Sequence, residues 1–244
     1  MARFFIPEED IQGDLLRVRE DAHHILHVLR MGIGDTITLC DGEGTDYICQ
    51  IEEIEGDTLL CRANARRTAE TEPEMEITLF QGIPKGDKME WIIEKGVETG
   101  LSRIVPVQMA RSVSHIEGKK AENKVQRWNK ISRSAAKQSQ RGRIPQVEAP
   151  IRLTQCLERL KEYDMVLVFY EEERRNSLRR ILQTASRPRK AAILIGPEGG
   201  LEPDEVRAFV GAGAKVAGLG PRILRTETAG PIATALLLYE WGQM

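Results

Sequence analysis

Between residue 77 and the C-terminus, short apolar runs alternate with amphipathic stretches, a rhythm compatible with few folds. The apolar runs predict strands at 77–81, 103–108, 165–170, 191–195 and 215–219. The amphipathic stretches predict helices at 85–99, 121–141, 177–184, 203–210 and 229–241. Because consecutive parallel strands need a crossover connection, the alternation predicts an α/β fold with a mainly parallel sheet and helices on both faces.

The first 70 residues follow a different pattern, typical of a small β-rich domain. Strands are expected at 15–19, 36–40, 46–54 and 58–65, with hairpin turns at 41–44 and 55–57. A short helix is expected between the first two strands, capped by Asp21 and ended by Gly32. The polar stretch 68–74 carries a proline and is typical of a linker.

The sequence gives little support for a metal site, a disulfide bond or a membrane-spanning segment. Buried, reduced thiols are expected at the widely spaced Cys40, Cys49, Cys61 and Cys156. His23 and His27 are one helical turn apart, as zinc ligands can be, but no cysteine or carboxylate motif completes a site. The sequence has no signal-peptide pattern and no apolar run of about 18 residues. We therefore expect a cytoplasmic protein without a metal or a membrane segment.

A strongly basic segment is hidden by the net charge of −2. Residues 119–143 hold nine cations and one acid, a local charge of 9 − 1 = +8, which favours a polyanion as partner. Three- and four-residue steps predict one basic row on the helix at 121–141, formed by Arg127, Lys130, Lys137 and Arg141. Trp128, Ile131 and Ala135 are expected to pack inward, and a solvated surface helix is the alternative interpretation.

Two strand ends carry unusual residues. The first, Ile195-Gly196-Pro197-Glu198-Gly199-Gly200-Leu201, follows a buried-type strand, and its glycines would let the backbone approach a ligand closely. A tight turn that uses glycine for geometry alone is the other interpretation. Neither the Gly-x-Gly-x-x-Gly pattern of dinucleotide sites nor a phosphate-binding P-loop motif occurs.

The second strand end, 219–229, reads Leu-Gly-Pro-Arg-Ile-Leu-Arg-Thr-Glu-Thr-Ala. Thr226 or Thr228 could cap the helix that follows. Capping does not account for Arg222 and Arg225, whose guanidinium groups suit a phosphate or the edge of a planar base.

Together these two segments resemble the ribosomal RNA small-subunit methyltransferase E family, the uridine-N3 methyltransferases of the SPOUT superfamily. The resemblance extends over nearly the whole chain. It includes Lys85-Gly86-Asp87-Lys88, the helix from Arg127-Trp128 to Gln138–Arg141, and His24–Met31 with Gly34-Asp35.

The resemblance implies a SPOUT-type methyltransferase domain at 75–244 with a deep trefoil knot, and a PUA-like RNA-binding barrel at 1–70. It further implies a homodimer and S-adenosylmethionine bound bent in the knot, within about residues 165–235. A third wall of that site is expected at 169–171. The implied donor-binding residues are Phe169, Leu194, Ile195, Gly196, Pro197, Glu198, Gly199, Gly200, Leu219, Gly220, Pro221, Ile223, Leu224, Arg225 and Thr226.

The implied reaction is methylation of N3 of a uridine in 16S ribosomal RNA, which needs a proton acceptor and alignment but no metal. Glu227 is the first candidate base, with Arg225 stabilising charge on the uracil and Glu198 as the next carboxylate; support of the first helical turn is the alternative role for Glu227. The RNA-binding residues expected are Arg3, His24, Arg30, Lys85, Lys88, Arg111, Arg127, Lys130, Lys137, Gln138 and Arg141.

Two other functions stay open on the sequence. One is a SPOUT enzyme that methylates another ribosomal or transfer RNA position. The other is a ribosome-assembly protein that binds RNA without catalysis.

Overall fold

The computed structural model describes residues 3–114 and 116–244, and the chain divides into two compact units. The first unit comprises the residues up to Glu72 together with Ala136–Ile144. The second comprises Pro73–Ala135 and Pro145–Met244. The segment 136–144 thus belongs to the N-terminal unit, whereas the sequence pattern had placed it in the second domain.

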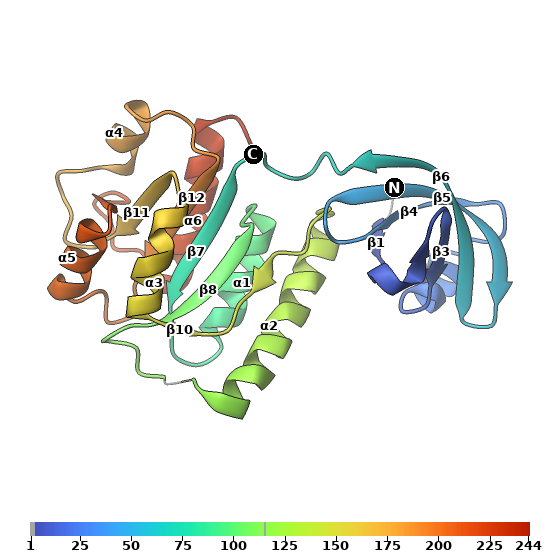
Figure 1. Ribbon diagram of the computed structural model, residues 1–244, viewed down its shortest axis with the longest axis horizontal. Coiled ribbons are helices and arrows are strands. Elements are labelled where there is room, and N and C mark those ends of the chain that lie inside the picture. The colour runs from blue at the N-terminus through green and yellow to red at the C-terminus, as the bar shows by residue number, and fades with distance from the viewer. Residues whose placement is uncertain (1–2, 115) are drawn as a thin grey trace. The chain divides into compact units, whose positions relative to one another are not determined.

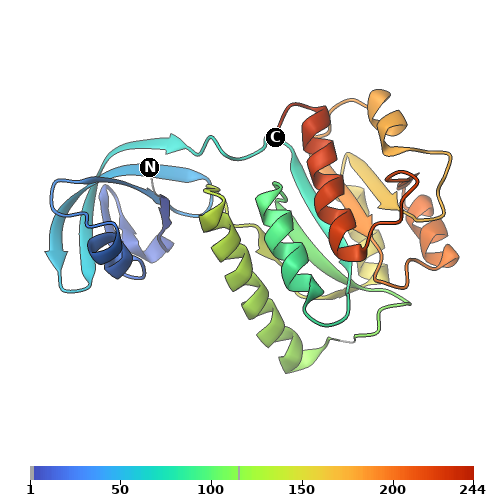
Figure 2. The same cartoon turned by 180° about the vertical axis from the view of Figure 1, so that it is seen from behind.

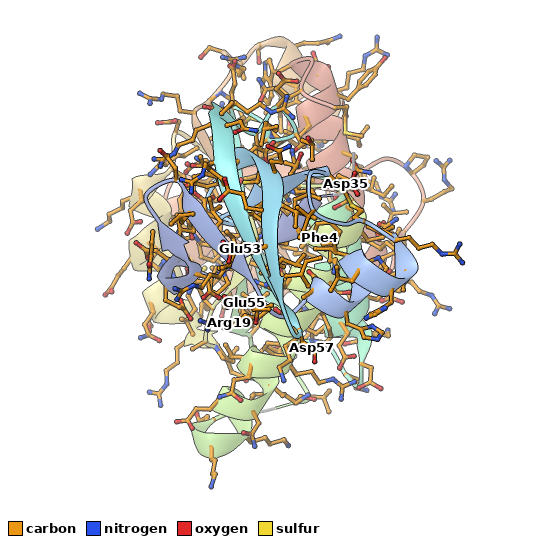
Figure 3. All side chains as sticks on the ribbon, turned by 90° about the vertical axis from the view of Figure 1, so that its right-hand side faces the viewer. Phe4, Arg19, Asp35, Glu53, Glu55 and Asp57 are labelled. Carbon is orange, nitrogen blue, oxygen red and sulfur yellow. The ribbon has the colours of Figure 1, made fainter. Side chains whose placement is uncertain are left out.

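The first unit is a curled six-stranded sheet, antiparallel except where its first strand pairs in parallel with β4. In sheet order its strands are β1 (Arg3–Phe5), β4 (Thr36–Cys40), β5 (Thr45–Glu55), β6 (Thr58–Thr68), β3 (Leu15–Val18) and β2 (Ile11–Gln12). The predicted turn between β5 and β6 is confirmed, with Gly56 at φ 58°. Figure 3 labels Asp57 at this turn, and Glu55 and Glu53 on the strand that leads into it.

The short helix of this unit, His24–Val28, is a π-helix. It ends at Val28 with Leu29 as its C-cap, and Arg30 follows in the left-handed conformation with φ 56°, so the prediction that Gly32 ends the helix is wrong. The side chain of Asp21 does not cap the helix; it forms an ion pair with Lys137 at 2.5 Å.

The second unit is built on a fully parallel sheet, as the alternation predicts. In sheet order its strands are β10 (Ile151–Arg152), β8 (Arg103–Gln108), β7 (Glu76–Gly82), β12 (Lys190–Ile195), β11 (Met165–Phe169) and β13 (Lys215–Ala217), with β9 (Gln146–Val147) also paired to β8. The central strands β7, β11 and β12 are almost entirely buried, as expected when helices cover both faces.

Helices lie on both faces of this sheet. Figure 1 shows α3 (Leu153–Arg159) and α5 (Pro203–Gly211) on one face, and Figure 2 shows α1 (Lys88–Glu98), α2 (Gly118–Gln138) and α6 (Thr226–Glu240) on the other. A short helix, α4 (Leu178–Gln183), follows β11. Two of the boundaries that differ from prediction affect candidate site residues: α2 ends at Gln138, before Arg141, and α6 begins at Thr226. The short elements α3, β9 and β10 lacked a periodic signal long enough to predict them.

Candidate functional site

Loops that follow β11, β12 and β13 surround a pocket of about 500 Å³. The three strands are neighbours in the sheet and all parallel, so their carboxyl ends meet at one edge. This edge is where ligands bind in open α/β sheets. The pocket is lined by residues of 169–174, 195–200 and 217–226, with Lys88 and Ala229.

The pocket brings together all but two of the predicted donor-binding residues. The exceptions among the described residues are Leu194, which is packed in the apolar core, and Pro221, whose carbonyl accepts a hydrogen bond from Arg174. Tyr170 and Glu171 form the third wall as expected. The sequence had not singled out Glu173 and Arg174, which also line the pocket and which no motif marked.

The glycines of the loop after β12 allow both a left-handed backbone conformation and close contact with neighbouring side chains. Gly200 has φ +74°, and a Cβ atom there would collide with the carboxylate of Glu171. A Cβ atom on Gly199 would lie 3.1 Å from the side chain of Arg111. Arg111 braces the same loop, donating to Gly199 O at 2.7 Å and to Glu202 at 2.8 Å. Arg111, expected to bind RNA, is therefore engaged in holding the pocket wall.

Thr226 does not cap α6. It is the first residue of the helix, and its N-cap, Arg225, makes no side-chain capping bond. The Thr226 hydroxyl instead donates to Gly196 O at 2.6 Å and accepts a hydrogen bond from Gln81 Nε2 at 2.9 Å. Capping by Thr226 is thus a wrong prediction: a capping hydroxyl accepts from an N–H group of the first turn, whereas Thr226 lies inside the helix and its hydroxyl accepts from Gln81.

Two carboxylates and a lysine converge beside the pocket. Lys88 Nζ lies 3.2 Å from Glu198 and 3.3 Å from Glu227, and Arg225 Nη1 lies 4.0 Å from Glu227. Lys88 therefore neutralises carboxylates, whereas the sequence predicted an RNA contact. Its position beside both glutamates carried no sequence signal.

The two glutamates differ in their hydrogen bonds. Burial would raise the pKa of Glu198, but its own N–H, the N–H of Lys85 and the ammonium of Lys88 outweigh burial and lower that pKa. Glu227 is in the first turn of α6, and its buried Oε2 lies 3.3 Å from Lys88 Nζ but makes no hydrogen bond to a described residue. Glu227 thus makes fewer hydrogen bonds than Glu198 and keeps more capacity to accept a proton from a ligand, which favours it as the base.

The basic helix is only partly available to a ligand. Trp128 and Ala135 are buried as predicted, and Ile131 is half-buried. Arg127 pairs with Glu90 at 2.8 Å, an acidic partner that the local sequence did not reveal. On α2, the exposed lysines that make no ion pair with a described residue are Lys119, Lys120 and Lys130.

Two residues predicted to contact RNA, Arg141 and Arg3, have side chains that are largely buried in ion pairs. Arg141 lies beyond the end of α2, is 4% exposed and pairs with Glu72 at 2.7 Å. Arg3 pairs with Asp46 at 2.7 Å. Of the other predicted contacts, Lys137 is paired with Asp21, and Arg111 and Arg127 are exposed but form ion pairs. Those exposed without an ion pair to a described residue are His24, Arg30, Lys85, Lys130 and Gln138.

No group of three potential metal ligands occurs among the described residues. His23 and His27 stack on each other with ring centroids 4.6 Å apart. All four cysteines are buried free thiols, and burial raises the pKa of each to about 12. In the part of the chain that the structure describes, none of the helices is both long and apolar enough to cross a bilayer.

Comparison with known proteins identifies both units. Residues 71–238 match the family model of the RNA methyltransferase domain, and residues 19–63 match that of the RNA methyltransferase PUA domain. The ribosomal RNA small subunit methyltransferase E of Bacillus subtilis is 37% identical over 225 residues, covering 91% of this chain and 88% of the relative. The protein of the same name from Mycobacterium tuberculosis is 33% identical over 88% of this chain and 82% of its own.

Solved structures agree. The crystal structure of a ribosomal RNA small subunit methyltransferase E from Neisseria gonorrhoeae bound to S-adenosyl methionine superposes with a TM-score of 0.83. It is 30% identical and covers 98% of this chain and 97% of that one. With a parallel α/β unit, a PUA domain and a glycine-walled pocket at the strand ends, the chain belongs to the ribosomal RNA small subunit methyltransferase E family.

Proposed function

We propose that this protein transfers a methyl group from S-adenosylmethionine to N3 of a uridine in 16S ribosomal RNA. The observation that carries the proposal is the pair Glu198 and Glu227, held by Lys88 beside a pocket walled by glycines. A relative's structure bound to the same donor supports the choice of ligand. The pocket volume of about 500 Å³ suits a molecule of that size.

The residues present fit the donor. The backbone of 195–200 and 217–226 would hold it, because glycines there leave N–H and C=O groups accessible. Glu171 would face its cationic or hydroxyl groups from the third wall. When bound, the donor supplies a methyl group activated by its sulfonium.

The protein's own groups supply alignment and proton removal. Glu227, in the first turn of α6, would take the imide proton of the uridine. Arg225, whose side chain is exposed beside Glu227, would stabilise the negative charge that grows on the uracil oxygens. Lys88 keeps both glutamates in reach of the pocket and offsets their mutual repulsion.

Donor binding is tested by Gly200→Ala. We expect the donor dissociation constant to rise by about tenfold or more, because alanine is strained at φ +74° and its methyl group displaces Glu171. Isothermal titration calorimetry with S-adenosylmethionine measures this. Gly211→Ala is the matched control, since a Cβ atom there meets nothing within 4 Å and its φ is ordinary. Equal affinities in the two variants would contradict the pocket assignment.

RNA binding is tested on the exposed lysines of α2. Replacing Lys119, Lys120 and Lys130 with glutamine should reduce the slope of log affinity against log salt by about 2, because each phosphate contact contributes about 0.7 for a single strand. Fluorescence anisotropy with a 16S ribosomal RNA fragment measures the slope. The control removes three other exposed cations of the same unit, Lys161, Arg179 and Arg180. If both triple variants lose slope equally, RNA is held by net charge and not by α2.

The N-terminal unit would bind RNA through its own exposed residues, His24 and Arg30.

We also propose that the protein is a cytoplasmic homodimer. Ile232, Leu236 and Tyr239 recur at helical spacing on α6 and are exposed, an apolar face that a second copy would cover. Sedimentation of the wild-type chain and of Leu236→Glu distinguishes a dimer from a monomer.

The choice of nucleotide is tested in cells. Mass spectrometry of 16S ribosomal RNA from cells lacking this protein should show one unmethylated uridine, restored by the wild-type chain. A missing methyl group on another ribosomal or transfer RNA would redirect the proposal, and intact methylation everywhere would favour a non-catalytic assembly role.

A further inference from the structure

A buried glutamine connects the two walls of the pocket. Gln81 is near the carboxyl end of β7, fully buried, and in register with Ile195 of β12. Its Nε2 donates to Thr226 Oγ1 at 2.9 Å and to Gly82 O at 3.0 Å. The Thr226 hydroxyl then donates to Gly196 O at 2.6 Å. One chain of hydrogen bonds thus joins β7, the start of α6 and the glycine loop.

The direction of this chain is fixed by chemistry. Gly82 O can only accept, so the amide of Gln81 must turn its nitrogen toward both partners. Thr226 Oγ1 receives that N–H, which leaves its single proton for Gly196 O. Without Gln81, the hydroxyl loses the donor that orients it.

The chain acts on the peptide from which the pocket wall starts. The carbonyl of Gly196 belongs to the peptide bond that leads into Pro197 and the rest of the glycine loop. Gly82 packs against that proline, since a Cβ atom on Gly82 would lie 2.6 Å from Pro197 N. Thr226 itself lines the pocket. Gln81 and Gly82 of β7 therefore set the spacing between the glycine loop and the start of α6.

Stability alone does not explain a glutamine here. Gln81 Oε1 is buried and has no hydrogen-bond partner among the described residues. A buried acceptor without a partner lowers stability, so an apolar side chain of similar shape would fold at least as well. Gln81 carries this stability cost directly behind Thr226, a residue of the pocket wall, and is more simply explained by the geometry that it gives the pocket.

We propose that Gln81 is a positioning residue for the methyl donor, acting through Thr226 on the glycine loop without touching either substrate. The inference rests on the proposed function, since it takes S-adenosylmethionine as the occupant of the pocket. Gln81 and Thr226 would fix the distance between residues 196–200 and the start of α6. This preorganises the site before the donor binds.

Gln81→Met is the main test, because methionine matches the shape of glutamine and removes both the amide donors and the unpaired Oε1. We expect the dissociation constant for S-adenosylmethionine to rise by about tenfold, the effect of about one hydrogen bond. The melting temperature of the variant should be unchanged or higher. Calorimetry and thermal unfolding provide the two readouts, and a purely structural role would lower both affinity and stability.

Thr226 provides the second test. Thr226→Val should weaken donor binding to a similar extent, whereas Thr226→Ser should bind the donor within about twofold of the wild type. The double variant, Gln81→Met with Thr226→Val, should bind the donor no more weakly than the weaker-binding single variant. Thr234→Val is the matched control: Thr234 is fully buried on the same helix, and its hydroxyl bonds only to Gly230 O at 3.0 Å. Its donor affinity should match the wild type.

Wild-type donor affinity in Gln81→Met would overturn the inference and leave the proposed function intact. So would equal losses of affinity in Thr226→Val and Thr234→Val, because these would report general destabilisation. A wild-type protein that does not bind S-adenosylmethionine at all would overturn the proposed function, and the inference with it.

Discussion

Glu227→Gln should lower the single-turnover rate of methylation by about 10²- to 10⁴-fold, the usual contribution of a general base. Glutamine keeps the shape of the side chain, but it cannot accept the imide proton. Affinities for the donor and for RNA should stay close to those of the wild type, because Glu227 contributes only one ion pair with Lys88 and a distant one with Arg225. Rapid-quench measurements with preformed complexes separate the chemical step from binding.

The pH dependence identifies the role of Glu227 further. Raising the pH should recover part of the loss in Glu227→Gln, because more of the uridine is already ionised. Arg225→Lys keeps a charge but loses the planar fork, so its defect should respond less to pH. Glu240→Gln, at the exposed far end of the same helix, is the control and should leave the single-turnover rate unchanged. A normal single-turnover rate in Glu227→Gln would leave that residue as a helix-end support, with Glu198 as the next carboxylate to test.

Glu72→Gln should reduce the free energy of unfolding of the N-terminal unit by about 3–5 kcal/mol, the cost of removing one partner from a buried ion pair. The Arg141 and Glu72 side chains are 5% and 11% exposed, so the substitution removes a carboxylate from beside a buried guanidinium. Glu72 also accepts hydrogen bonds from the N–H groups of Gly142 and Arg143. These bonds attach the segment 136–144 to the sheet, so chemical denaturation followed in the N-terminal unit should detect the change.

This pair also predicts how stability depends on pH. Burial would raise the pKa of Glu72, but the hydrogen bonds and charge of Arg141, with the two N–H groups, lower it below its usual value. A carboxyl group whose pKa is lower in the folded state stabilises the protein fully above its unfolded pKa. That stabilisation is lost as the pH falls through the folded pKa, and Glu72→Gln should remove this acid-dependent component.

Asp14→Asn is the control for Glu72→Gln. Asp14 pairs with Arg66 at 2.7 Å, but both side chains are about half exposed or more, so the expected loss is below about 1 kcal/mol. If the two substitutions cost the same, the Arg141–Glu72 pair does not hold the segment in place.

Local sequence was sufficient for the order of the longer elements of the second unit and for singling out the two loops, 195–201 and 219–229, that line most of the pocket. The strands β7, β11 and β12 are apolar because both faces are covered, and a run of that kind is visible in the chain. The glycines of 196–200 mark a close backbone approach in the same way. The trefoil knot stays a prediction, since an order of strands does not specify how a chain threads.

The sequence by itself determined which residues follow each strand, and therefore which loops meet at the carboxyl edge of the sheet. Only the tertiary structure decided which charges are free. Arg127 meets Glu90 from 37 positions away, and Arg141 meets Glu72 from 69 positions away. Gln81 and Lys88 reach the site in the same manner, by contacts across 145 and 139 positions (227 − 88) in the chain. Periodicity encodes the burial of a residue within its own element, whereas the partner of a charge or an amide depends on which elements the fold brings side by side.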